Sequence, residues 1–128
     1  MTKWTGRLTI SSVGNNKYFT LGPFLPTSAK LYISANNDGP DDPAAHSCAG
    51  ETNGTTQSYD SSFKQGTNEF YEEGTDRIIK HREHNGTNFV TAVEAQFLTF
   101  VTIGGLHTIK MNVFAGSTNY KATIVCKN

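Results

Sequence analysis

Two segments near the C-terminus, LHTIKMNVFA (Leu106–Ala115) and YKATIVCK (Tyr120–Lys127), decide the fold class of this chain. Apolar residues occupy every second position of both segments: Ile109, Met111 and Val113 in the first, and Tyr120, Ala122, Ile124 and Cys126 in the second. A period of two is typical of a strand with one buried face and one solvated face. The run between them, Gly116-Ser117-Thr118-Asn119, consists of turn formers, so we expect the two segments to form an antiparallel hairpin.

The composition favours one all-β domain over the whole chain, residues 1–128. The chain has eleven basic and eleven acidic side chains and a formal net charge of zero. This balance argues against a nucleic-acid surface, where an excess of Lys and Arg would neutralise phosphates. Turn formers recur at short intervals and helix-forming composition is missing, which is typical of a β-sandwich or barrel.

The same alternation predicts further strands along the chain, at Trp4–Val13, Lys17–Leu21, Ala29–Ala35, His46–Glu51, Thr55–Phe63, Arg77–His84 and Thr87–Val101. Gln65–Gly74 is polar and is expected to be irregular, whereas Asn85-Gly86 predicts a tight hairpin turn. With about eight or nine strands and no helix, the chain fits a single antiparallel β-sandwich of jelly-roll or Greek-key type.

The longest predicted strand, Thr87–Val101, carries apolar residues on both of its faces. Phe89, Val93, Ala95 and Phe97 share one phase, while Val90, Ala92 and Leu98 share the other. We expect a central strand, or a strand whose second face contacts another subunit.

Neither membrane insertion nor secretion is expected from the sequence. No stretch is apolar enough to span a bilayer, and the N-terminus lacks the apolar core of a signal peptide. The chain is therefore expected to fold in a cytoplasm. The two cysteines, Cys48 and Cys126, are too few for a disulfide scaffold and are expected to be buried core residues, although a bridge between them stays open.

The acidic loop Asp38, Asp41 and Asp42 is the first candidate ligand site, because carboxylates suit a hard cation such as calcium. Its resemblance to a calcium-binding EF-hand loop fails at the first position, Ser34, and at the twelfth, Ala45. A solvated turn is the preferred interpretation, and no metal or other cofactor is expected.

No catalytic constellation stands out. His81 and His84 are three residues apart, which places them on opposite faces of one strand. Cys48 has His46 on the same strand face, but no orienting third group is evident, and Glu72 and Glu73 diverge in an extended chain. We therefore expect a protein that is not an enzyme.

Aromatic residues exceed what one small core needs. We expect some of Trp4, Tyr59, Phe63, Phe70 and Tyr71 to serve as anchors in an interface or as stacking platforms for sugars. Phe70 and Tyr71, which are expected to lie in a loop, join the three aspartates as candidate ligand or interface residues.

The order of several motifs resembles small β-sandwich domains of tailed bacteriophages. The motifs are Phe19-Thr20-Leu21-Gly22-Pro23-Phe24-Leu25-Pro26-Thr27, Ser47-Cys48-Ala49-Gly50, Asn53-Gly54-Thr55-Thr56-Gln57, Thr75-Asp76-Arg77-Ile78-Ile79-Lys80-His81, and Val93-Glu94-Ala95-Gln96-Phe97 before the final strand pair. The resemblance spans roughly residues 7 to 127 and brings no catalytic signature. Gly104-Gly105-Leu106 departs from the Gly-Phe that often precedes the last hairpin in such domains.

The resemblance implies a virion structural protein, either a head-decoration (cement) protein or a small tail component. Such a protein would assemble in the host cytoplasm, form a homotrimer, and bind the major capsid or tail proteins of the particle. A receptor-binding, lectin-like module that recognises glycans on the host surface is the alternative. A groove at the loop ends, rimmed by Tyr or Trp and with convergent Asp and Asn, would favour that alternative.

Overall fold

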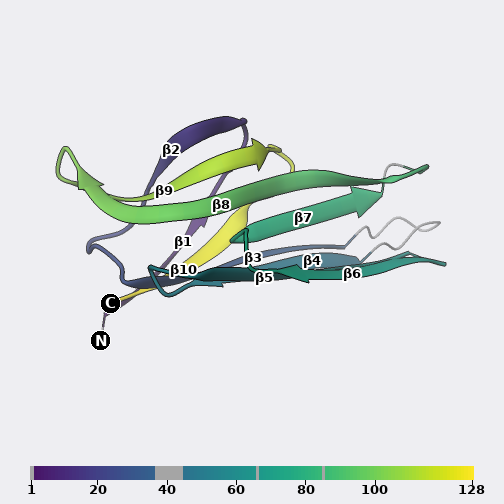
Figure 1. The fold of residues 1–128 in the computed structure, drawn as a ribbon, viewed down its shortest axis with the longest axis horizontal. Helices are drawn as coiled ribbons and strands as arrows, with labels where there is room; N and C mark the ends of the chain where they lie inside the picture. Colours follow the sequence, from purple (N-terminus) through teal and green to yellow (C-terminus); the bar gives the residue numbers. More distant parts are fainter. Residues whose placement is uncertain (1, 37–44, 66, 85) are drawn as a thin grey trace.

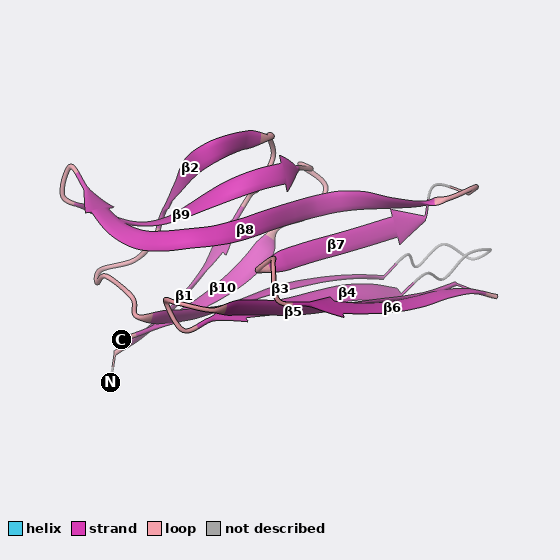
Figure 2. Ribbon diagram, in the orientation of Figure 1, coloured by secondary structure: helices cyan, strands magenta, loops and turns pink. Residues whose placement is uncertain are grey.

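A computed structural model describes residues 2–36, 45–65, 67–84 and 86–128, which contain ten strands and no helix (Figure 2). The all-β prediction is confirmed. The strands are β1 (Lys3–Leu8), β2 (Gly14–Thr20), β3 (Ser28–Asn36), β4 (Ala45–Thr52), β5 (Gln57–Gln65), β6 (Asn68–Gly74), β7 (Ile79–His84), β8 (Phe89–Ile103), β9 (Leu106–Ala115) and β10 (Ala122–Lys127).

The strands form two antiparallel sheets that pack face to face. Six strands make one sheet, in the order β1-β10-β3-β4-β5-β6, and four make the other, in the order β2-β9-β8-β7. Figure 1 shows β7, β8 and β9 lying over the six-stranded sheet. The predicted sandwich is thus present, with one or two strands more than the pattern predicted.

The predicted C-terminal hairpin is wrong. Strand β9 pairs with β2 and β8, whereas β10 pairs with β1 and β3 in the other sheet. The turn formers at residues 116–119 instead carry the chain from one sheet to the other, and the Ser117 amide donates to the Ile10 carbonyl oxygen. Both segments bury one face, but they bury it against the same core from opposite sides.

Residues predicted to be irregular form an edge strand. Most of Gln65–Gly74 lies in β6, which pairs with β5 from Tyr59 opposite Gly74 to Gln65 opposite Asn68. The alternation typical of a strand cannot be recognised in this segment, because its outer face is polar and its inner face carries a glutamate, Glu72. An inward-pointing charge on an edge strand is one way in which proteins discourage unwanted pairing.

Two bulges explain why the sequence of β8 is apolar on both phases. Ala92 is an extra residue against β7, where His81 pairs with Val93 but Arg82 pairs with Thr91, and Leu98 is an extra residue against β9, between the pairs of Phe97 and Thr99. The second bulge changes which phase of the strand faces the core. Phe97 and Phe100 consequently contact each other with ring centroids 4.9 Å apart, and both pack on the core.

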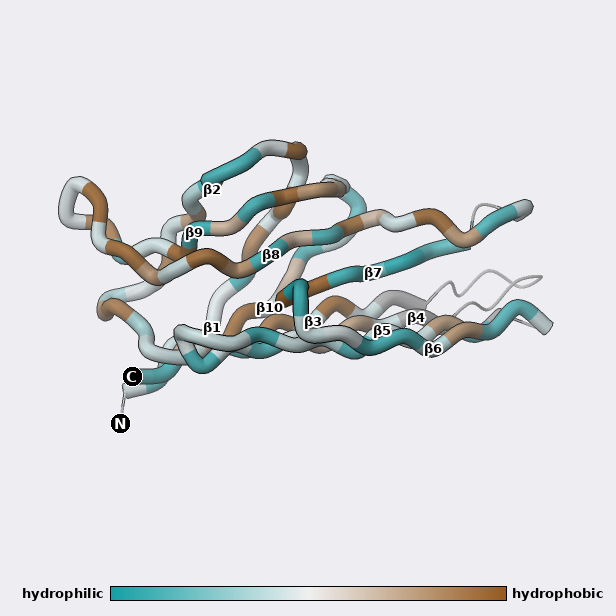
Figure 3. The backbone as a smooth tube through the Cα atoms, in the orientation of Figure 1, coloured by the Kyte–Doolittle hydropathy of each residue, from teal (hydrophilic) through white to brown (hydrophobic). Residues whose placement is uncertain are grey.

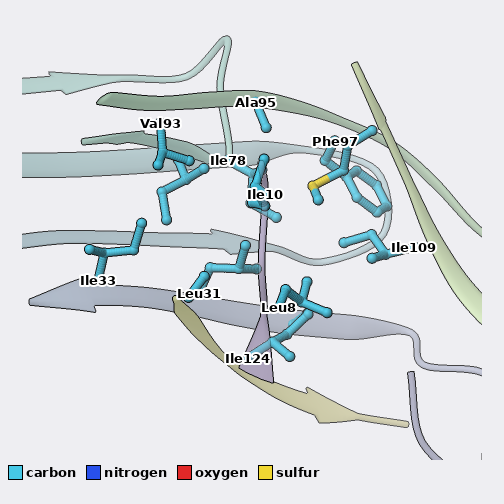
Figure 4. Packing of buried hydrophobic residues seen from close by; sticks show 14 of the residues in the cluster. Leu8, Ile10, Leu31, Ile33, Ile78, Val93, Ala95, Phe97, Ile109 and Ile124 are labelled. Carbon is cyan, nitrogen blue, oxygen red and sulfur yellow. The ribbon is translucent and has the colours of Figure 1, made fainter. Parts of the chain in front are cut away.

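The core lies between the sheets, where branched aliphatic residues from both layers interlock (Figure 4). Of the residues predicted to face inward in the C-terminal segments, Tyr120 is partly buried against the core and the others are fully buried, namely Ile109, Met111, Val113, Ala122, Ile124 and Cys126. Both cysteines are buried and free, as expected for core residues. Their positions in β4 and β10, with β3 between, separate them by more than a disulfide can span.

The two sheets come into close backbone contact where the residue before β7, Ile78, meets β4. A Cβ atom at Gly50 would stand 1.4 Å from the carbonyl oxygen of Ile78, so only glycine fits at this point. Two residues along each strand, the Lys80 amide donates to the Cys48 sulfur over 3.3 Å. Backbone and side chain of β4 therefore cover the free edge of β7.

Two of the exposed apolar side chains flank the turn between β8 and β9. Figure 3 shows this hairpin projecting from one end of the sandwich with apolar colouring near its tip. Ile103 and Leu106 are 43% and 54% exposed there. Gly104 and Gly105 between them have φ values of 57° and 82°, which a two-residue hairpin turn requires.

Candidate functional site

Of the candidate ligand residues from the sequence, the described chain contains Phe70 and Tyr71. Asp38, Asp41 and Asp42 lie outside the described residues. Phe70 and Tyr71 lie in strand β6, not in a loop, and their side chains point to opposite faces of the sheet.

Phe70 faces inward and belongs to an aromatic group at one end of the sandwich. Its ring centroid lies 5.3 Å from that of Phe89, and the Arg82 guanidinium carbon lies 5.4 Å from the Phe70 centroid. Phe63 and His84 contact the same Phe89 ring. These contacts hold the two sheets together, so Phe70 is half-buried and poorly placed to meet a ligand.

The histidines considered for metal binding also lie apart. His81 is fully buried against the ring of Tyr120, with centroids 4.8 Å apart, whereas His84 packs on Phe89. Within residues 2–36, 45–65, 67–84 and 86–128, no group of three or more His, Cys, Asp or Glu side chains is arranged to hold a metal ion.

A candidate site that the sequence did not reveal lies on the outer face of the six-stranded sheet, which faces away from β7 and β8 (Figure 1). Strand register aligns one row of outward side chains across five strands: Thr123, Tyr32, Ala49, Asp60 and Glu73. The next row along the strands contains Val125, Lys30, Glu51 and Ser58. Apart from Thr123, the residues of these two rows line a groove.

The groove consists of two adjoining hollows. The smaller, of about 610 Å³, has Ala49 and Gly50 in its floor and Tyr32, Asp60 and Glu73 around it. The larger, of about 930 Å³, continues toward β1 and β10. Five residues line both hollows and make them continuous: Lys30, Tyr32, Glu51, Ser58 and Thr75. A volume of this order suits a small ligand.

Tyr32 is the exposed aromatic residue of the groove, whereas Tyr59, which also lines it, is buried. Its side chain is 42% exposed although it lies mid-strand in β3, between Thr123 of β10 and Ala49 of β4. The small neighbour Ala49 leaves one side of the tyrosine open. An exposed ring beside carboxylates is suited to a ligand with both apolar faces and hydroxyl groups, because each part then finds its partner.

Opposite ends of the groove differ in charge. Asp60 stands directly opposite Glu73 on neighbouring strands, and the Tyr71 hydroxyl donates to Glu73 Oε2 over 3.0 Å. At the other end Lys3 stands directly opposite Lys127. Like charges in directly opposed positions destabilise a sheet, so neither pair is explained by strand pairing.

The sequence contains a signal for this face that strand periodicity could have revealed. In β3 the inward residues Leu31 and Ile33 alternate with Lys30 and Tyr32, so the outward position of Tyr32 was predictable. Which strands lie beside β3, and hence that Asp60 lies across Ala49 from Tyr32, depends on strand order. Strand order is not encoded in local periodicity.

Comparisons with protein-family models, with curated proteins and with solved structures find no match for this chain. The resemblance to phage virion domains therefore stays a prediction. No helix of the described chain has the length and hydrophobicity needed to cross a membrane.

Proposed function

We propose that this protein is a non-catalytic carbohydrate-binding domain that holds a glycan in the groove on its six-stranded sheet. The observation that carries the proposal is the groove floored by Ala49 and Gly50, with Tyr32 on one side and Asp60 on the other. This is the receptor-binding, lectin-like alternative, with the ligand on a sheet face instead of at loop ends.

The chemistry of the groove supports this ligand class. A sugar ring presents apolar C–H groups on one face and hydroxyl groups on its rim. The Tyr32 ring offers an apolar surface, and the carboxylates of Asp60 and Glu73 accept hydrogen bonds from hydroxyl donors. The wide, open shape of the groove favours a chain of sugar units over an enclosed small molecule.

Binding of oligosaccharides to the full chain, measured by titration calorimetry and by changes in amide NMR shifts, tests the proposal. We expect the shifts to cluster in β3, β4 and β5, and Tyr32→Ala to weaken binding roughly tenfold, because a stacked aromatic ring contributes about 1 kcal/mol or more. Tyr18→Ala is the matched control, since Tyr18 is 49% exposed on the other sheet. Equal loss in both variants, or no binding of any oligosaccharide, would refute the proposal.

A second candidate function is the virion role that the phage resemblance implies. The exposed apolar side chains of Ile103 and Leu106 favour it, because an apolar tip suits a contact with a neighbouring protein of an assembly. In this proposal the chain is a homotrimeric structural subunit on a phage particle, bound to capsid or tail proteins. Gold-labelled antibodies applied to phage particles test it: label over the head or the tail supports the role, and unlabelled particles refute it.

A further inference from the structure

We propose that the groove selects an acidic oligosaccharide and fixes its direction, with the anionic group at the lysine end and a neutral sugar between Tyr32 and Asp60. The inference rests on the proposed carbohydrate-binding function and names its ligand class. A carboxylate and a sulfate share the relevant chemistry, which is negative charge carried on oxygen acceptors.

The lysine end is built from three strands. Lys3 of β1, Lys127 of β10 and Lys30 of β3 all line the larger hollow. Lys3 and Lys127 are directly opposed, so their charges repel each other across the strand pair. None of the ion pairs in the described chain involves these three lysines. An anion seated between them would relieve the repulsion and gain charge-assisted hydrogen bonds.

Lys30 lies near a carboxylate with which it forms no ion pair. Glu51 stands directly opposite Lys30 on β4, yet no ion pair joins them. Between the sheets, by contrast, the Glu72 carboxylate receives Lys80 over 2.9 Å and Arg82 over 3.1 Å. The charges of Lys30 and Glu51 in the groove therefore remain available to a ligand.

The opposite end of the groove excludes an anion. Asp60 and Glu73 are directly opposed and line the smaller hollow but not the larger one. Ionised carboxylates only accept hydrogen bonds, so this end suits neutral hydroxyl groups and repels an acidic sugar. Repulsion at one end and attraction at the other determine the direction of the ligand.

The dimensions of the sheet agree with a short oligosaccharide. Lys30 and Asp60 lie two strands and one outward position apart. With about 4.8 Å between strands and about 3.4 Å per residue, their Cα atoms are about 12 Å apart. Tyr32 lies between the two ends and lines both hollows, where it can stack on the sugar unit that joins them.

Titration calorimetry with oligosaccharides of matched length tests the inference on the full chain. The probes are neutral hexose oligomers, hexuronic acid oligomers and sulfated hexose oligomers. We expect the acidic probes to bind roughly tenfold more tightly than the neutral ones, because charge-assisted hydrogen bonds are about twice as strong as neutral ones. Raising the ionic strength should remove most of this preference.

Two variants test the direction of the ligand. Lys30→Ala should reduce the affinity for acidic probes and leave that for neutral probes nearly unchanged. Asp60→Asn should weaken the binding of both kinds. Lys110→Ala is the matched control, because Lys110 lies on the other sheet beside the Tyr18 ring and should change neither affinity. Thermal melting checks that each variant is folded.

The outcomes separate this inference from the proposed function. Equal affinity for acidic and neutral probes would overturn the inference and leave the proposed carbohydrate binding intact. An equal loss of affinity for both kinds of probe in Lys30→Ala would do the same. No binding of any probe would overturn both. Self-association that Lys30→Ala abolishes, without oligosaccharide binding, would assign the groove to a second copy of the chain and likewise overturn both. Binding of only sulfated or only uronic acid probes supports the inference and identifies the anion.

Discussion

The side-chain amide of Gln57 forms two hydrogen bonds with the backbone of Phe97 in the opposite sheet. Gln57 Oε1 accepts from the Phe97 amide over 2.8 Å, and Gln57 Nε2 donates to the Phe97 carbonyl oxygen over 3.1 Å. Pairing of β8 with β7 ends where Ile79 stands opposite Ala95, so no neighbouring strand serves Phe97 on this side. Gln57 takes the place of a paired strand residue and joins the two layers.

Replacing Gln57 by Ala should therefore lower the free energy of unfolding by about 2 kcal/mol, because two partly buried backbone groups lose their partners. Chemical denaturation measures the change. Gln57→Glu should recover little, since a carboxylate cannot donate to the Phe97 carbonyl oxygen. Gln96→Ala, at the residue before Phe97 in β8, is the control and should lower the free energy of unfolding by less. A loss at Gln57 no larger than at Gln96 would contradict the importance assigned to this contact.

Gly50→Ala should be the most damaging single methyl addition in this sheet. The added carbon would stand 1.4 Å from the Ile78 carbonyl oxygen, so β7 must move away from β4. We expect a loss of about 3 kcal/mol or more, at the upper end of overpacking penalties. Thermal melting of Gly50→Ala beside Ser58→Ala, a change on the outer face, measures it. Similar melting temperatures would mean that the strands separate easily.

Stability should fall in acid because of Glu72. Burial by itself would raise the pKa of Glu72, but the hydrogen bond from Tyr59, the contact with Lys80 and the charge of Arg82 outweigh it and hold the pKa below its usual value. A lowered pKa in the folded state contributes stability above the unfolded pKa of about 4.3. That contribution is lost as the pH falls through the folded pKa.

Glu72→Gln isolates this effect. At neutral pH the variant should be less stable by about 1–3 kcal/mol, because hydrogen bonds to a charged group are lost. Its melting temperature should then change less on acidification than that of the native sequence. Glu69→Gln, an exposed change on the same strand, should retain the native pH dependence. A Glu72→Gln profile parallel to the native one would contradict the assignment.

Both thiols should be unreactive in the folded protein. Burial raises the pKa of the Cys48 thiol to about 12 and that of Cys126 to about 11, so little thiolate forms near neutral pH. A chromogenic disulfide reagent at mildly alkaline pH should detect almost no thiol before denaturant is added and two afterwards. Fast labelling of one thiol in the native state would show that its strand opens readily.

The sequence predicted strand positions well and strand partners poorly. The alternation in Leu106–Ala115 and Tyr120–Lys127 correctly identified the residues that face the core, yet it suggested a hairpin where the chain changes sheets. Periodicity records which face of a strand is buried. It does not record whether the next strand along the chain pairs in the same sheet or crosses the core to the other sheet.

The same limit applies to the groove and to the polar contacts between sheets. The outward positions of Tyr32 and Asp60 follow from periodicity, but their alignment on either side of Ala49 follows from register across three strands. The β6 strand was missed because its inner face carries a glutamate. Its charge is stabilised between the sheets by Tyr59, Lys80 and Arg82, which only the tertiary structure brings together.

By itself, the sequence determined that this protein is all-β, that its cysteines are core residues, and which side of most strands meets solvent. These properties are local, since the pleat fixes side-chain direction residue by residue. The tertiary structure alone decided the strand order, the bulges of β8 and the groove across β3, β4 and β5. Those features depend on contacts between residues distant in the chain, whose free energy is gained only after both sheets have formed.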